Sequence, residues 1–163
     1  MDWKDRTMDK PEFVYVTYIL STPEKVWSAL TDGEVTKQYW FRRKNASEWK
    51  VGSKWEHQDY DNPATVDIVG KVVESDPPRR LVITWALPAD AAAEEKHSRV
   101  TFEIEPFNET VRLKVTHDRF APGSDMLRDI SNGWPMVLSS LKTFLESGQP
   151  MPMATRRTTH PPE

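Results

Sequence analysis

The chain has 163 residues, a length that suits a single domain, and a formal net charge of −3 with a sequence pI near 5.8. Its basic residues are dispersed in short clusters at expected loops, such as Arg42-Arg43-Lys44, which argues against a nucleic-acid-binding face. The absence of cysteine excludes disulfides, thiolate nucleophiles and cysteine-based metal sites.

Two features of the sequence bear on location. No stretch approaches the ~20 consecutive apolar residues of a membrane-spanning helix. The first residues are charged and no apolar segment follows them, so no signal peptide is predicted. The expected location is therefore the cytoplasm, with neither a membrane nor a nucleic acid as a partner.

The first predicted element is a strand from Glu12 to Leu20, which is rich in β-branched and aromatic residues. A helix is expected to begin at Ser21, because Ser21 and Glu24 fit a capping box and Pro23 suits a first helical turn. A second short helix is expected from Glu34 to Phe41.

Six further strands are predicted between turn residues such as Asp76-Pro77-Pro78. They cover residues 47–50, 53–60, 65–75, 80–87, 99–105 and 110–117, with an Ala/Glu-rich excursion at 88–96. The last two strands alternate apolar and polar residues, as in Val100, Phe102 and Ile104. This alternation predicts an antiparallel sheet with one face in solvent.

A long amphipathic helix is predicted to close the domain after Gly133, with Gly148 as its stop, because glycine readily adopts the left-handed cap conformation. Pro135 removes a backbone donor, so a kink or a helix restart is expected near Gly133. Such a break would separate residues 125–132 from the closing helix, and these residues would then line the mouth of a cavity. The apolar residues at helical spacing are Trp134, Val137, Leu138, Leu141, Phe144 and Leu145.

Composition divides the chain into three parts. Residues 1–11 form an N-terminal extension, residues 12–149 form the domain, and residues 150–163 form a tail. The tail contains four prolines and no large aliphatic residue except methionine, which predicts disorder.

A run of strands followed by one long helix predicts an α+β fold. In it, a curved antiparallel sheet wraps around the C-terminal helix, with two short helices after the first strand. Such a sheet often leaves a cavity against the helix, here of roughly 300–1,000 Å³, and aromatic walls would suit a planar organic ligand. Plain core packing is the alternative for each of these side chains. The predicted cavity residues are Trp40, Trp55, His57, Ile68, Ile83, Trp85, Phe102, His117, Trp134 and Leu138.

An ordered set of motifs carries a resemblance to a known family. Residues 21–32 look like its opening signature, and Tyr39-Trp40-Phe41, residues 70–78, 80–85 and 99–104, Val115-Thr116-His117 and Gly133-Trp134 follow in the family order. The set resembles the AHSA1-like branch, named for the activator of the Hsp90 ATPase, of the START-like or SRPBCC superfamily. The resemblance covers residues 12–148. It implies a helix-grip (START/Bet v 1-like) fold around a mostly apolar cavity, and its name implies chaperone contact and a stress response.

The usual catalytic motifs are absent, since the sequence has no GxSxG, Walker loop, GxGxxG or HExxH. If they face inward, His57 and His117 are candidates for a general acid/base pair or for metal ligands. Otherwise each makes one hydrogen bond in a polar patch or lies at a strand end in water. The sequence places no carboxylate to orient either ring, so no catalytic residue and no metal site are predicted.

The function predicted from these observations is binding of a small apolar or amphipathic molecule, aromatic ones included, for sequestration or sensing, without a cofactor. His57, His117 or a tryptophan N–H would orient the ligand. Two alternatives stay open. One is an interaction protein that docks on an Hsp90-type chaperone or on a second copy of itself. The other is an enzyme, such as a cyclase, hydrolase or dehydratase, that uses the cavity histidines.

Overall fold

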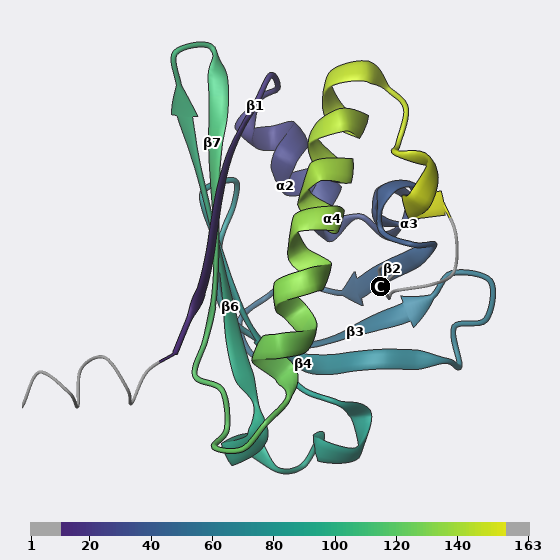
Figure 1. The fold of residues 1–163 in the computed structure, drawn as a ribbon, viewed down its shortest axis with the longest axis vertical. Helices are drawn as coiled ribbons and strands as arrows, with labels where there is room; N and C mark the ends of the chain where they lie inside the picture. Colours follow the sequence, from purple (N-terminus) through teal and green to yellow (C-terminus); the bar gives the residue numbers. More distant parts are fainter. Residues whose placement is uncertain (1–10, 156–163) are drawn as a thin grey trace, which may run out of the picture.

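Seven antiparallel strands form one sheet in the order β1-β7-β6-β5-β4-β3-β2 in the computed structural model, which describes residues 11–155. The strands are β1 (Phe13–Ile19), β2 (Arg43–Ser47), β3 (Lys54–Asp59), β4 (Val66–Asp76), β5 (Arg80–Trp85), β6 (Ser98–Phe107) and β7 (Thr110–Asp118). The sheet turns sharply between its β1-β7-β6 side and its β4-β3-β2 side, and the long helix lies in the angle (Figure 1). The predicted α+β helix-grip fold is therefore confirmed.

Two short helices and one long helix cover the concave face of the sheet (Figure 1). They are α2 (Pro23–Thr31), α3 (Gly33–Tyr39) and α4 (Met126–Ser147), and the 3₁₀ turns are η1 (Pro88–Asp90), η2 (Glu94–Lys96) and η3 (Pro152–Thr155). The strand expected at 47–50 is wrong. The chain instead pairs earlier, over β2, and Trp49 has a φ of 57° in the turn toward β3.

The cap of α2 also differs from the expectation. Thr22, not Ser21, is the N-cap, and its hydroxyl accepts a hydrogen bond from the backbone N–H of Lys25 at 3.3 Å. With Thr22 as the cap, Pro23 is the first helical residue, where a missing backbone N–H costs nothing. The position of the proline therefore decides where the helix begins.

Helix α4 is one continuous helix that begins at Met126, so the helix restart predicted near Gly133 is wrong. A proline inside a helix costs about 3 kcal/mol, but tertiary packing of the helix face outweighs this cost. The buried face continues on both sides of the half-buried Pro135, with Ile130 and Trp134 before it and Leu138 after it. Gly148 ends the helix in the left-handed conformation, as predicted, with a φ of 80°.

The alternation in β6 and β7 correctly predicts which side chains are buried. The core contains Val100, Phe102 and Ile104 of β6, and Val111, Leu113 and Val115 of β7. On the helix, Leu141 is fully buried among them. These residues fill the space between α4 and the β6-β7 side of the sheet.

Trp55 on β3 crosses over Gly70, its cross-strand partner on β4. Its indole Nε1–H donates a hydrogen bond to the backbone oxygen of Thr84 on β5, at 2.7 Å. A Cβ on residue 70 would lie 2.0 Å from that oxygen and 2.4 Å from the indole nitrogen. Glycine at this position therefore lets the indole bridge three strands.

The structure differs from the expected disordered tail where the tail begins. The turn η3 contacts α3 and α4, and Met151 and Met153 on either side of Pro152 are half-buried. The flexible, apolar methionine side chains give this segment surface to bury. Residues 1–10 and 156–163 lie outside the described residues, so the proposed extension and the rest of the tail stay predictions.

Candidate ligand-binding cavity

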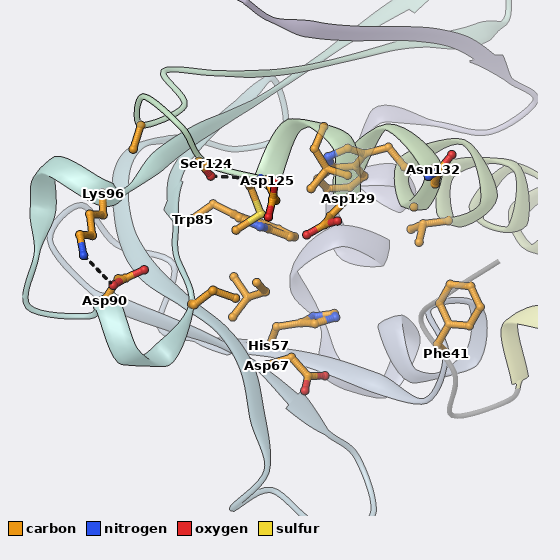
Figure 2. Close-up of a pocket in the computed structure, with 18 of the residues that line it drawn as sticks. Phe41, His57, Asp67, Trp85, Asp90, Lys96, Ser124, Asp125, Asp129 and Asn132 are labelled. Carbon is orange, nitrogen blue, oxygen red and sulfur yellow. Dashed lines mark hydrogen bonds and ion pairs between the residues drawn. The ribbon is translucent and has the colours of Figure 1, made fainter. Parts of the chain in front are cut away.

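A cavity of about 670 Å³ lies between the N-terminal half of α4 and the β3-β4-β5 side of the sheet (Figure 2). The end of α3, the segment from η1 to η2, and the loop at residues 121–125 complete its walls. This volume is within the usual range for small-molecule sites. The cavity occupies one end of the angle between helix and sheet, while buried side chains fill the other.

Four aromatic rings line the cavity and form a closed circuit of contacts. The ring centroids of Trp40 and His57 are 4.9 Å apart, and those of His57 and Trp85 are 6.4 Å apart. Trp134 on α4 closes the circuit, at 5.4 Å from Trp85 and 5.5 Å from Trp40. We call these four residues the aromatic floor. It offers both ring faces and ring edges to a planar or cationic group.

His57 presents one free ring nitrogen. Its Nδ1 lies 2.7 Å from Oδ1 of Asn45, whose own amide nitrogen donates to the backbone oxygen of Leu30 at 3.3 Å. The amide therefore accepts at Oδ1, and His57 carries its proton on Nδ1. Burial, and then the positive charge of Arg43, lower the pKa of His57 to about 3. The ring is neutral at neutral pH, and its Nε2 accepts no hydrogen bond from residues 11–155.

His117 differs from His57 because both of its ring nitrogens have partners. Its Nε2 donates to Ser98 Oγ at 2.7 Å, since that hydroxyl donates its own hydrogen to the backbone oxygen of Trp85. The indole N–H of Trp134 donates to Nδ1 at 3.1 Å. Burial lowers the pKa of His117 to about 3, so this ring is also neutral. His117 therefore fixes the orientation of Trp134 in the aromatic floor.

Trp85 brings an unsatisfied donor to the cavity wall. The residue is 6% exposed, and its indole Nε1–H is buried without a hydrogen-bond partner among the described residues. Buried donors almost always have a partner, so an unpaired one calls for an explanation. Protein atoms cover this nitrogen, so a ligand acceptor would reach it only if the indole turned toward the cavity.

The structure divides the ten predicted cavity residues into two equal groups. Those that line the cavity are Trp40, His57, Ile68, Trp85 and Trp134. Those that do not are Trp55, Ile83, Phe102, His117 and Leu138, all buried. The second group forms the layer behind the floor: the ring of Trp55 lies 5.3 Å from that of Trp85, and the ring of Phe102 lies 5.9 Å from that of Trp134. Their part in ligand binding remains a prediction.

Sequence reasoning missed two parts of the lining, Phe41 and the loop at 121–124. Residues 125–132, expected at the cavity mouth, do contribute to the lining, but as the start of the continuous helix α4. Phe41 follows α3 with a φ of 52°, which directs a buried phenylalanine to the wall in a way that no pattern signals. The apolar residues in the first turns of α4 could be recognised from the sequence by their spacing. Met126, Ile130 and Trp134 continue the apolar spacing upstream of Gly133.

Arg43 is not a loop residue as the sequence suggested. It lies in β2, nearly buried, where its Nε pairs with Asp67 and its Nη1 lies 3.4 Å from Asp59. Two carboxylates offset the cost of burying the guanidinium. Arg42 beside it is more exposed and pairs with Asp61 at 2.6 Å.

Within residues 11–155, no three His, Cys, Asp or Glu side chains gather closely enough to hold a metal ion. No helix in this range is both long and apolar enough to cross a lipid bilayer.

Comparison with known proteins gives a family match. The model of the family described as "Activator of Hsp90 ATPase homolog 1-like protein" matches residues 21–146. No curated protein matches the sequence.

Solved structures share the fold at low sequence identity. The crystal structure of CalU16 from Micromonospora echinospora is 20% identical, with 84% of this chain and 77% of that chain covered and a TM-score of 0.66. PFC0360w, an HSP90 activator from Plasmodium falciparum, is 23% identical, with 82% and 95% covered and a TM-score of 0.67. The Aha1 dimer from Colwellia psychrerythraea is 21% identical, with 85% and 98% covered and a TM-score of 0.67.

Proposed function

This chain belongs to the Activator of Hsp90 ATPase homolog 1-like family, and from that premise we propose that it binds a small apolar or amphipathic molecule in the cavity under α4. The binding serves sequestration or sensing of that molecule, aromatic ones included, without a cofactor. A cytoplasmic location is part of the proposal.

One observation carries the proposal: the cavity combines an apolar aromatic floor with a polar atom that has no partner among the described residues. That atom is Nε2 of His57, an acceptor, and the covered indole Nε1–H of Trp85 would add a donor if the ring turned toward the ligand. Small-molecule sites typically consist of an apolar wall with a few placed polar groups that fix orientation. A hydroxyl or amine on the ligand would donate to His57, and an ether, carbonyl or hydroxyl oxygen would accept from Trp85.

The same geometry favours binding over catalysis. A histidine with a pKa of about 3 is a weak base at neutral pH and holds no second proton to give, so His57 suits neither role of a general acid/base catalyst. Both ring nitrogens of His117 are already hydrogen-bonded. The two rings therefore cannot share a proton relay without first breaking contacts in the core.

Gly133 offers a direct test of the cavity. It lies on α4 in the cavity wall, and a Cβ there would meet no atom within 4 Å. Replacement by leucine would place a side chain in this space, so Gly133→Leu should lower the affinity for 1-naphthylmethanol roughly tenfold, an overlap cost of about 1–3 kcal/mol. Quenching of tryptophan fluorescence measures the affinity, and native mass spectrometry of the purified wild type identifies any retained ligand.

Gly133→Ala is the matched control, because a methyl group leaves most of the cavity open. Both variants should be at least as stable as the wild type, since glycine disfavours a helix by about 1 kcal/mol. Equal affinity of the wild type and Gly133→Leu would contradict binding at this site. Binding would also be contradicted if the purified protein retained no small molecule and did not bind 1-naphthylmethanol.

His57→Gln tests the orienting role of His57. Glutamine offers an amide oxygen in place of Nε2, in a different position and orientation, so affinity for 1-naphthylmethanol should fall by about 0.5–1.5 kcal/mol, the net contribution of one hydrogen bond. His97→Gln is the control, because His97 bonds Thr84 and the backbone of Asp90 and does not line the cavity. A product formed from the retained molecule by the wild type but not by His57→Gln would make the protein an enzyme instead.

A second candidate function is docking on an Hsp90-type chaperone, as the family description and the Plasmodium relative suggest. The observation that favours it is an apolar row on the outer face of edge strand β1 and its flanks. Tyr18 in this row lies 5.3 Å from the ring of Phe107, and both are nearly half-exposed. The row consists of Val14, Val16, Tyr18, Leu20 and Phe107.

If this row docks the chaperone, Val16→Lys should abolish stimulation of the chaperone's ATPase by the protein, because it places a charge in an apolar contact. Val51→Lys is the control, since Val51 is exposed in the turn between β2 and β3, at the opposite edge of the sheet from β1. An ATPase that the wild type does not stimulate would rule this function out. Light scattering in the same buffer reports whether the row instead joins two copies.

A further inference from the structure

Acidic side chains dominate the charge around the cavity. Asp67, Asp90, Asp125 and Asp129 line it, and Lys96 is the single basic residue in the lining that the structure describes. The geometry points to a positively charged amphiphile as the occupant, with its apolar body on the aromatic floor and its ammonium group at Asp125 and Asp129. This inference rests on the proposed function and specifies the chemical class of its ligand.

Two of the four carboxylates already have a cation within the protein. Asp67 pairs with the nearly buried Arg43. Asp90 lies 3.6 Å from Lys96, the one basic lining residue, so these two charges offset each other. The remaining negative charge in the lining belongs to Asp125 and Asp129, both at the start of α4.

Arg128 does not remove this charge from the cavity. It lies 3.6 Å from Asp125 and 3.7 Å from Asp129, but its side chain is 73% exposed and it does not line the cavity. Asp125 and Asp129 are 74% and 60% exposed, so water competes for both partners and these pairs contribute little. Figure 2 shows Asp129 projecting from α4 toward the side of the cavity that holds His57.

The floor suits a cation as well. Indole faces attract an ammonium group, and they do so more strongly where water is excluded. His57 offers Nε2 as an acceptor for an N–H, and its ring carries no positive charge that would repel the ligand. An anionic ligand would instead meet the carboxylates of α4 and find Lys96 already paired.

The test compares three probes that share a naphthalene ring and differ in charge: 1-naphthylmethylamine, 1-naphthylmethanol and 1-naphthylacetate. We expect the amine to bind about threefold more tightly than the alcohol at low salt, because water weakens an ion pair at the largely exposed Asp125 and Asp129. The acetate should bind most weakly, because the nearby carboxylates act over roughly the Debye length of ~10 Å. Calorimetric titration gives the three affinities. The preference for the amine should shrink as salt is added.

Asp129→Asn should bring the affinities for the amine and the alcohol close to each other, measured as the ratio of the two within the variant. Glu105→Gln removes the same charge from β6, outside the cavity lining, and should leave the preference intact. Equal binding of amine and alcohol, or tighter binding of the acetate, overturns the charge selectivity but keeps the cavity as a binding site. Failure of all three probes to bind overturns the proposed function together with this inference.

Discussion

Gly70→Ala is expected to destabilise the protein by at least about 3 kcal/mol, the upper end of what overpacking usually costs. The new methyl group would lie 2.0 Å from the backbone oxygen of Thr84, which belongs to a paired strand and cannot move aside cheaply. It would also lie 2.4 Å from the indole nitrogen of Trp55. Relief requires the indole to leave its position, which breaks the hydrogen bond to Thr84. Urea-induced unfolding followed by circular dichroism measures the change.

Gly133→Ala is the control for the chemistry of the substitution, because it adds the same methyl group where no atom lies within 4 Å. It should be neutral or stabilising. If Gly70→Ala also proved neutral, the close approach of Trp55 to the backbone would be wrong. The aromatic floor would then lose its support, since Trp55 packs directly behind Trp85.

Much of the fold could be predicted from the spacing of apolar residues along the chain. In β6 and β7, strict alternation identifies the buried face. A slip of one residue in strand register would turn the whole apolar set toward solvent, so the register is strongly specified. The C-terminal part of α4 follows from its apolar spacing and from Gly148. The start of α4 is harder to predict, because Pro135 indicates a break in the helix that the apolar residues upstream of it do not. The cost of the proline is local, while Ile130 and Trp134 bury a continuous helix face.

The site was harder to predict because an inward side chain can face either a cavity or another side chain. Phe102 and Leu138 point inward as predicted, yet they lie in the filled part of the core. Ile68 and Trp85 point the same way but lie where the sheet and α4 diverge. Whether an inward side chain reaches the cavity depends on the curvature of the sheet and on the loop at 121–125. Neither feature produces a periodic pattern in the sequence. Polar lining residues such as Asp129 look like ordinary solvated positions in the sequence.

The histidines show the same limit for chemistry. Sequence alternation placed both inward, but it could not assign their partners. Asn45 lies 12 residues before His57 in the sequence, and the two pair only because β2 and β3 place them opposite each other. Ser98 and Trp134 reach His117 from β6 and α4. These partners leave one histidine with a free nitrogen and the other with none, which decides which of them can touch a ligand.

Acid should destabilise the protein strongly between pH 6.5 and pH 5, because two histidines are buried in neutral form. The pKa of each falls from 6.5 in the unfolded chain to about 3 in the folded protein. As the pH drops below 6.5, the unfolded chain binds protons that the folded protein does not. Stability is therefore full above pH 6.5 and is lost progressively toward pH 3.

At pH 5 each histidine has lost about 2 kcal/mol of stability, from 1.36 kcal/mol per pKa unit over about 1.5 units. Both together remove about 4 kcal/mol, a large part of the 5–15 kcal/mol that holds a typical domain folded. The measurement is the free energy of unfolding in urea at pH 7.5, 6.5, 5.5 and 5. Staying at or above pH 5 keeps the carboxylates Glu34 and Glu146, whose pKa values are lowered by Lys37 and Lys142 respectively, out of the titration.

The variants separate this effect from general acid sensitivity. His117→Gln lowers stability at every pH, because Trp134 and Ser98 lose a partner, but it should also halve the slope of unfolding free energy against pH. His57→Gln should halve the slope in the same way, and the double variant should be nearly flat between pH 6.5 and pH 5. A wild-type free energy that is equal at pH 7.5 and pH 5 would mean that these rings are not buried as the structure has them. The free acceptor on His57 would then be open to protonation, and the cavity could not hold a cation beside it at mildly acidic pH.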